Sequence, residues 1–124
     1  MQKRNEGGVM EIKQLAPAEI IRDEYGFWVH PVLDEYLSQV LNGREFMTYS
    51  EHERMLKHFN ISLSRKEMEW DCSEELADKY WGDGDIDATK DWQPTSPNGD
   101  GWFLVSINDT EDGPVAWWAK EKVA

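Results

Sequence analysis

The pattern of hydrophobic and polar residues is clearest toward the end of the chain, at residues 92–120. Residues 102–107 (WFLVSI) are rich in types that favour strands, and residues 115–118 (VAWW) form a second apolar run. The intervening residues 108–113 (NDTEDG) are mostly turn formers. This pattern predicts an antiparallel hairpin, around which we expect the rest of the fold to be organised.

Helical spacing of apolar residues precedes the hairpin. The strongest example is at 31–41, which begins with a proline and is followed by Asn42-Gly43, a typical helix end. A shorter helix is predicted at 18–23 and a bulky extended link at 27–30, because a proline follows the link. A weak alternation at 11–15 indicates a short strand.

Two capping boxes are indicated in the middle of the chain, where a serine and a glutamate three residues later satisfy free backbone N–H groups. The first, at 50–53 (SEHE), would start a helix that ends near Phe59. The second, at 64–67 (SRKE), would start another helix. Ser73 is expected to cap a further short helix that Gly82 ends.

The order of these elements predicts a small α+β domain, in which a C-terminal antiparallel hairpin or short sheet packs against several short helices. We expect one domain over residues 10–124. Residues 1–9 are polar and contain two glycines, so we expect them to form a disordered extension. Met10 is then an alternative to Met1 as the natural start of the protein.

Charge is unevenly distributed along the chain. The formal net charge is −12, and residues 67–91 contain ten acids against two lysines, which gives this segment −8. Such a surface repels phosphates, so we do not expect nucleic acid or an anionic membrane as a direct ligand. It fits a basic protein as partner, or a surface that imitates the charge of DNA.

Residues 83–91 resemble the opening of a calcium loop, in which oxygen ligands alternate along the chain. The sixth and twelfth positions depart from that pattern, because Ala88 and Pro94 stand where glycine and glutamate are required. The segment is therefore a weak calcium candidate or a solvated acidic loop. The residues concerned are Asp83, Asp85, Asp87 and Asp91.

Other catalytic or metal patterns are lacking in the sequence. His30, His52 and His58 do not have the spacing of a helical zinc pair, and no nucleophile elbow or phosphate-binding glycine loop is present. Cys72, the single cysteine, lies among acids that should raise the pKa of its thiol. We expect a non-enzymatic protein with no cofactor, in a reducing cytoplasm.

Trp117 and Trp118 are adjacent in the second predicted strand, so their side chains should face opposite sides of the sheet. One would enter the core and the other would be an outward binding anchor, unless helices or a neighbouring loop cover both faces. The candidate partner-binding residues are these two, Trp81 and the acids Glu74, Glu75, Asp78, Asp83, Asp85 and Asp87.

Two segments carry a family resemblance. Residues 92–114 read W-x-P-x-x-P-x-G-x-GWFL-x-SI-x-DTEDGP, and residues 15–23 (LAPAEIIRD) are followed by GFW-x-HP at 26–31. They resemble the two ends of small, uncharacterised proteins encoded by phages and prophages of enteric bacteria; residues 32–91 are not matched. The resemblance implies an accessory gene product in the host cytoplasm, with a role in host takeover, regulation or counter-defence.

Charge and resemblance together favour a non-enzymatic accessory protein that binds a host protein through residues 67–91 and an exposed tryptophan. An alternative is an acidic DNA mimic that occupies a nucleic-acid-binding host protein. A small metal-dependent hydrolase and a structural component of the phage particle also remain open. Aromatic residues near a short sheet edge are compatible with a homodimer.

Overall fold

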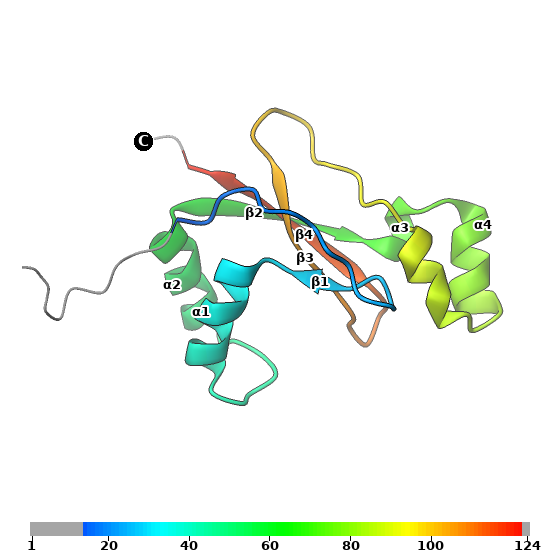
Figure 1. Ribbon diagram of the computed structural model, residues 1–124, viewed down its shortest axis with the longest axis horizontal. Helices are drawn as coiled ribbons and strands as arrows, with labels where there is room; N and C mark the ends of the chain where they lie inside the picture. Colours follow the sequence, from blue (N-terminus) through cyan, green and yellow to red (C-terminus); the bar gives the residue numbers. More distant parts are fainter. Residues whose placement is uncertain (1–13, 123–124) are drawn as a thin grey trace, which may run out of the picture.

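The structure, a computed structural model, describes residues 14–122. A four-stranded antiparallel sheet lies at its centre, with strand order β1-β3-β4-β2 (Figure 1). The strands are β1 (Trp28–Val29), β2 (Ile61–Glu67), β3 (Phe103–Asn108) and β4 (Val115–Glu121). The predicted α+β class and C-terminal hairpin are therefore confirmed. The predicted extension at 1–9 lies outside the described residues, as does most of the strand predicted at 11–15, whose last two residues are irregular.

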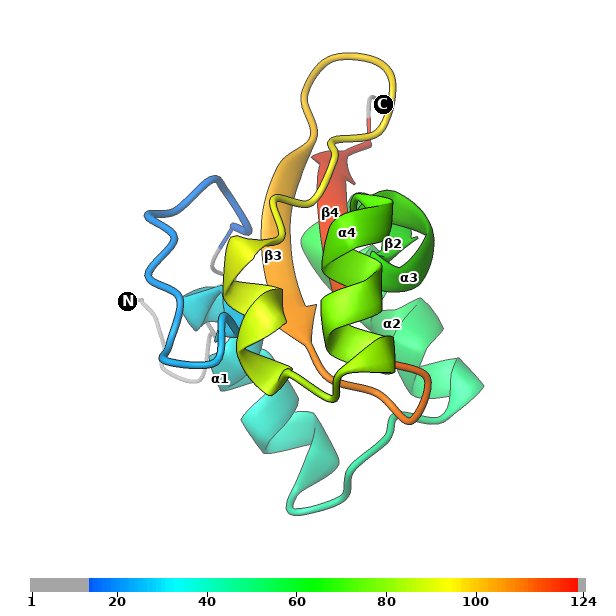
Figure 2. The ribbon, with the colours of Figure 1, turned by 90° about the vertical axis from the view of Figure 1, so that its right-hand side faces the viewer.

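Helical segments cover both faces of this sheet (Figures 1 and 2). One hydrophobic cluster lies between the sheet and the longer helices, α1 (Pro31–Leu41) and α2 (Tyr49–Phe59). The other lies between the opposite face and four short segments. These are the α-helices α3 (Met68–Asp71) and α4 (Glu74–Ala77), the π-helix η1 (Asp78–Gly82) and the 3-10 helix η2 (Ile86–Asp91).

A β-bulge in β3 links the sheet to the first helix. Between Leu104 and Ser106 the register of β3 against β4 shifts by one residue, so Val105 is the extra residue of the strand. Its carbonyl accepts a hydrogen bond from the backbone N–H of His30, at 2.8 Å. The bulge thereby fixes the point at which the chain enters α1.

The bounds of α1 confirm the helix predicted at 31–41. His30 caps it, because Nδ1 accepts a hydrogen bond from the N–H of Val32 at 3.1 Å. The other ring nitrogen, Nε2, is hydrogen bonded to the carbonyl of Ala16 and must carry the proton, so the buried ring is neutral. Asn42, in the left-handed conformation at φ 47°, ends the helix as predicted.

Helix α2 begins with a capping box that differs from the predicted one at 50–53. The Thr48 hydroxyl accepts a hydrogen bond from the N–H of Glu51 at 3.2 Å, and the Glu51 carboxylate accepts one from the N–H of Thr48 at 2.9 Å. Thr48 is the residue with extended backbone before the helix, so Ser50 falls inside the first turn and cannot be the cap. The predicted end at Phe59 is confirmed.

The second predicted capping box, at 64–67, is wrong, because these residues belong to strand β2. Ser64 lies opposite Trp118 and Glu67 opposite Val115 in the antiparallel pair with β4. A ladder of cross-strand hydrogen bonds outweighs one local side-chain cap, and this ladder forms only when a distant part of the chain is in place.

The cap predicted at Ser73 does form. Its hydroxyl accepts a hydrogen bond from the N–H of Leu76 at 3.1 Å, and α4 continues directly into η1, which ends at Gly82 as the sequence indicated. Residues 83–85 form the expected loop, with Gly84 at φ +70°.

The helix predicted at 18–23 does not form; the segment is irregular and leads into a turn at 24–25. Long-range contacts hold it in this state. The guanidinium of Arg22 donates hydrogen bonds to three backbone carbonyls, those of Gly26 at 2.8 Å and of Thr89 and Trp92 at 2.7 Å. Charge-assisted bonds to η2 therefore replace those of a local helix.

Gly26 allows this turn to approach η2 closely. Its φ is +89°, and a Cβ atom there would lie 2.9 Å from backbone atoms of Lys90. The carboxylate of Asp23 closes the turn by accepting hydrogen bonds from the N–H groups of Tyr25 and Phe27, both at 2.9 Å.

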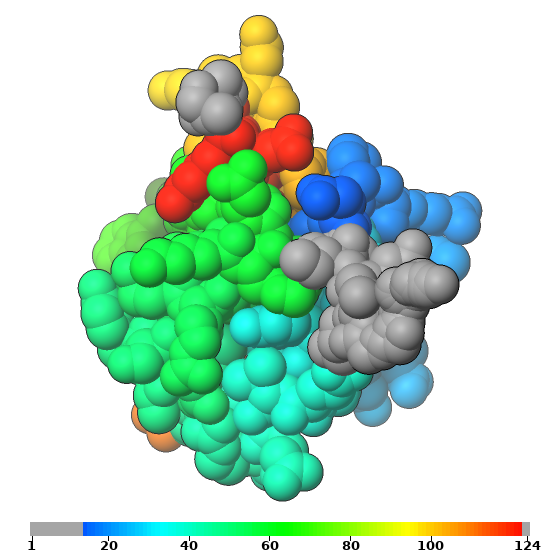
Figure 3. Space-filling model, turned by 90° about the vertical axis from the view of Figure 1, so that its left-hand side faces the viewer, coloured from blue at the N-terminus to red at the C-terminus, as the bar shows by residue number. Residues whose placement is uncertain are grey.

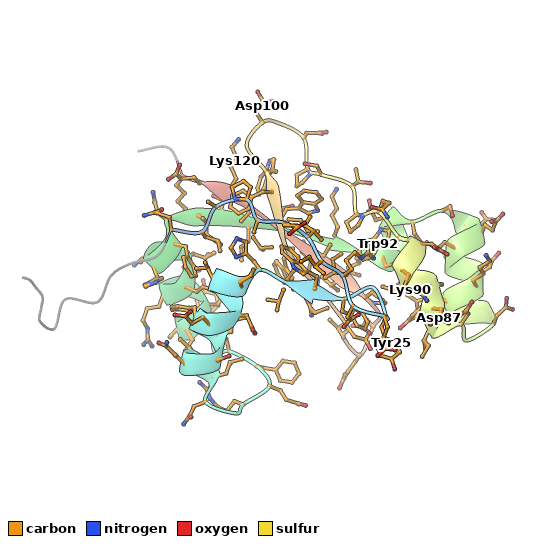
Figure 4. All side chains as sticks on the ribbon, viewed as in Figure 1. Tyr25, Asp87, Lys90, Trp92, Asp100 and Lys120 are labelled. Carbon is orange, nitrogen blue, oxygen red and sulfur yellow. The ribbon has the colours of Figure 1, made fainter. Side chains whose placement is uncertain are left out.

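Trp92 lies where the sheet meets the short helical segments (Figure 4). The side chain is 1% exposed, and its Nε1–H donates to the Asp71 carboxylate at 3.0 Å. The same carboxylate oxygen accepts a hydrogen bond from the N–H of Thr95 at 2.8 Å. By contrast, the buried Nε1 of Trp118 has no hydrogen-bond partner within residues 14–122.

This difference predicts that two matched substitutions lower the free energy of unfolding by different amounts. Trp92→Phe removes a hydrogen bond to a charged group, whereas Trp118→Phe removes an unpartnered buried N–H. We expect Trp92→Phe to lower the free energy of unfolding by about 1.5–3 kcal/mol more than Trp118→Phe. Urea unfolding followed by far-UV circular dichroism measures both values, and equal losses would show that the Asp71 bond contributes nothing.

A second prediction concerns the capping box of α2. Hydrogen bonds from Arg44 and from the N–H of Thr48 lower the pKa of Glu51 from 4.5 to about 2. Because the pKa is lower in the folded state, the stabilisation is complete above the unfolded value of 4.5 and is lost as the pH falls toward 2. Glu51→Gln should remove this part of the acid sensitivity.

An NMR titration of the Glu51 side-chain carboxyl, with thermal midpoints measured over the same pH range, tests the point. Glu53→Gln, an exposed carboxylate on the same helix, is the matched control and should leave the acid profile as it is. A normal titration midpoint for Glu51 would contradict the proposed cap geometry.

Candidate partner-binding surface

The acidic lobe, defined here as residues 68–91, contains α3, α4, η1 and η2. It lies at one end of the molecule, and α4–η1 stands beside η2 on the surface that faces the viewer in Figure 2. Nine acids and two lysines belong to it. The lobe therefore concentrates most of the net charge of the chain in one region.

All six acids predicted to bind a partner are exposed in this lobe. The side chain of Asp87 lies 3.8 Å from the Lys90 ammonium, and the Asp85 carboxylate caps η2 by accepting the N–H of Asp87 at 2.9 Å (Figure 4). The other four make no ion pair within residues 14–122, which leaves their charge uncompensated: Glu74, Glu75, Asp78 and Asp83.

The weak calcium candidate is not assembled as a ligand group. Two of its four aspartates are used in the local contacts just described, and no three His, Cys, Asp or Glu side chains of the described part of the chain gather so as to hold a metal ion. Asp91 lies at the end of η2 and is exposed.

Exposed apolar side chains accompany the acids. Trp70 is 80% exposed, Ile86 61% and Trp81 40%. Trp81 is held in place by stacking edge to face on Tyr80, with ring centroids 4.5 Å apart, and by the turn at Gly113, where a Cβ atom would lie 2.6 Å from the indole ring. Exposed large apolar side chains among charged residues are candidate anchors for a protein partner.

Trp117 and Trp118 face opposite sides of the sheet as expected, and the structure follows the alternative in which both faces are covered. Both residues are partly buried, Trp117 against the α1–α2 cluster and Trp118 against the cluster beneath the lobe. The guanidinium of Arg65 also lies over the Trp117 ring, 5.7 Å from its centroid. Among the described residues the exposed tryptophans are Trp70 and Trp81.

The exposure of Trp70 was not predicted, because the false capping box at 64–67 starts the predicted helix too early and so gives the wrong position for its apolar face. In the one-turn helix α3, Met68 is fully buried, and a side chain two positions later points away from the core. The signal that could have located Trp70 is its position between Glu69 and Asp71, since two flanking acids favour a solvent-facing position.

The three histidines lie at different places. His30 is the neutral cap of α1, and His58 stacks on Tyr36 and Phe59, with centroid distances of 4.8 and 4.7 Å. The ring of His52 lies 6.4 Å from that of Trp117. Each histidine ring therefore contacts a different set of aromatic residues.

Cys72 is also poorly suited to nucleophilic chemistry. Burial raises the pKa of its thiol, and the negative charge of Asp71 raises it further, in the direction that the sequence predicted. The Sγ atom donates a hydrogen bond to the carbonyl of Ser73 at 3.3 Å. A raised pKa disfavours the reactive thiolate.

Comparison with known proteins finds no matching family model, no matching curated protein and no matching solved structure. Within residues 14–122, no helix combines the length and the apolar character needed to cross a membrane. Arguments about function therefore depend on the residues and geometry of this chain.

Proposed function

We propose that this chain is a non-enzymatic accessory protein of a phage or prophage that binds a basic protein in the cytoplasm of its bacterial host. The observation that carries the proposal is the acidic lobe, in which Glu74, Glu75, Asp78 and Asp83 are exposed and make no ion pair among the described residues, and which also contains the exposed Trp70. Unpaired charge gives long-range attraction to a basic partner, and an exposed indole gives a short-range anchor.

The two features contribute differently to binding. Carboxylates on a solvated surface mainly raise the association rate, and salt screens their effect. A tryptophan that becomes buried removes up to about 250 Å² of surface from water, and this term depends little on salt. A partner should therefore be attracted by charge and retained by the contact with Trp70.

A DNA mimic is the second candidate, and one observation favours it. The segments α4–η1 and η2 stand side by side (Figure 2), and each carries exposed acids. A mimic requires two rows of carboxylates in place of the two phosphate backbones, and two neighbouring acidic segments favour this role. In this case the host partner would be a nucleic-acid-binding protein, and duplex DNA would compete for it.

The test begins with capture from host lysate at low and high salt, followed by binding measurements with the purified partner. The variant Asp83→Asn, Asp85→Asn, Asp87→Asn should weaken binding about tenfold at low salt and flatten its salt dependence. Trp70→Ala should weaken binding at both salt concentrations. Competition by duplex DNA would identify the mimic.

A matched control removes three negative charges elsewhere. Glu53, Asp100 and Glu121 are all exposed and lie outside the lobe. Their combined change to Gln, Asn and Gln should leave the affinity within about twofold, since charges beyond a Debye length of roughly 10 Å are largely screened at moderate salt. Equal effects of the two triple variants would show that only net charge matters and would contradict a binding site on the lobe.

A further inference from the structure

A cavity of about 430 Å³ lies between α1, α2 and the sheet, at the end of the molecule opposite the acidic lobe (Figure 1). Its walls are largely apolar and come from both helices and all four strands. They include Leu33 and Leu37 of α1, Met55 of α2, Leu63 of β2, Val105 of β3 and Trp117 of β4. Figure 3 shows this end of the molecule, where α1 and α2 lie side by side.

A cavity of this size differs from an ordinary packing defect. Protein interiors are close-packed, and their voids seldom exceed the volume of a water molecule. This cavity is partly open to solvent, because Asp34, Glu45 and Phe46 in its lining are exposed, so it is a surface pocket and not an interior void. The volume falls instead within the range of about 300–1,000 Å³ that is typical of small-molecule sites.

The carboxylate side chains that line this cavity are not balanced by a basic side chain of its described lining. Asp34 of α1 and Glu45 of the connector after α1 contribute exposed carboxylates, and neither makes an ion pair within residues 14–122. The lining includes no lysine or arginine among the described residues. The cavity therefore combines an apolar interior with a negative, uncompensated boundary.

The connector between α1 and α2 adds an exposed aromatic ring. Phe46 lines the cavity although it is 76% exposed, while the neighbouring Met47 is partly buried. A ring in this position has apolar surface available to a molecule that enters the cavity. The polar ring of His52, which makes no hydrogen bond with other described residues, lies among the same lining groups.

We propose that this cavity binds a small amphiphile with an apolar body and a cationic head, such as a protonated aliphatic or aromatic amine. The body contacts Leu37, Met55 and Trp117, and the head lies close to the carboxylates of Asp34 and Glu45. An anionic head would be repelled, and a neutral head would leave both charges unpaired. The site shares no residue with the acidic lobe and is independent of the proposed partner contact.

Three probes with the same alkyl chain test the proposal on the full-length protein: n-octylamine, 1-octanol and n-octanoate. Calorimetry should give octylamine a dissociation constant about tenfold lower than that of octanoate, with octanol between them. In amide and indole NMR spectra, the Nε1–H signal of Trp117 should shift on binding, and that of the buried Trp92 should not. The variant Trp117→Phe assigns the signal.

Two double variants distinguish the contribution of the cationic head to the affinity from that of the apolar body. Asp34→Asn with Glu45→Gln should reduce the affinity for octylamine to that for octanol and leave octanol binding unchanged. Glu53→Gln with Asp100→Asn removes the same charge from exposed positions outside the cavity. This control should change neither the affinity for octylamine nor the affinity for octanol. Leu37→Trp, which fills the cavity, should abolish binding of all three probes; should it fail to fold, the charge variants still decide.

The proposal is overturned if octanoate binds as tightly as octylamine, if the paired Asp34 and Glu45 variant keeps its preference for the amine, or if no probe shifts the Trp117 signal. Sedimentation at the concentrations used supplies a further outcome. A dimer that takes up no probe would assign the cavity to a second copy of the chain and would likewise overturn the proposal.

Discussion

The contact between Trp92 and Asp71 is the junction on which the arrangement of this fold depends. The buried indole donates to a carboxylate of α3, and the carbonyl of Trp92 accepts a hydrogen bond from Arg22. The same carboxylate receives the N–H of Thr95 at the start of the long loop before β3. Trp92, through its side chain and its carbonyl, and Asp71 together thus join the acidic lobe, the loop and the N-terminal segment to the sheet. Burial of the Arg22 guanidinium lowers its pKa, because burial disfavours the charged form. Hydrogen bonds from its N–H groups to three carbonyls offset this loss of hydration.

The central strands then divide the molecule into two halves with different character. Side chains alternate along β4, so Trp117 and Trp118 belong to different hydrophobic clusters. The cluster beneath the lobe is closed around Trp92, and its outer surface is strongly acidic. The cluster beneath α1 and α2 does not fill the space between these helices and the sheet, and this space is the cavity. The proposed partner surface and the proposed small-molecule site therefore share no residue.

The elements that the sequence predicted correctly are those determined by local chemistry. The 31–41 helix, the Ser73 cap and the hairpin all depend on residues close together in the chain. The errors at 18–23 and 64–67 have the opposite origin, since Arg22 bonds to residues about seventy positions away and Ser64 pairs with Trp118. For the site, exposure of the acids could be predicted from composition. The exposure of Trp70 and the cavity could not, because both depend on how distant elements pack.

The way in which the lobe is attached also bears on its proposed role. Concentrated negative charge destabilises a compact state through self-repulsion, and the lobe contains only two lysines to offset it. The lobe is attached through the Asp71 carboxylate, which accepts hydrogen bonds from a neutral indole and a backbone N–H and from no cation among the described residues. Lys90 compensates Asp87 weakly at 3.8 Å, and the remaining acids extend into solvent. The fold therefore tolerates this charge without neutralising it, and a basic partner would supply the missing countercharge from outside.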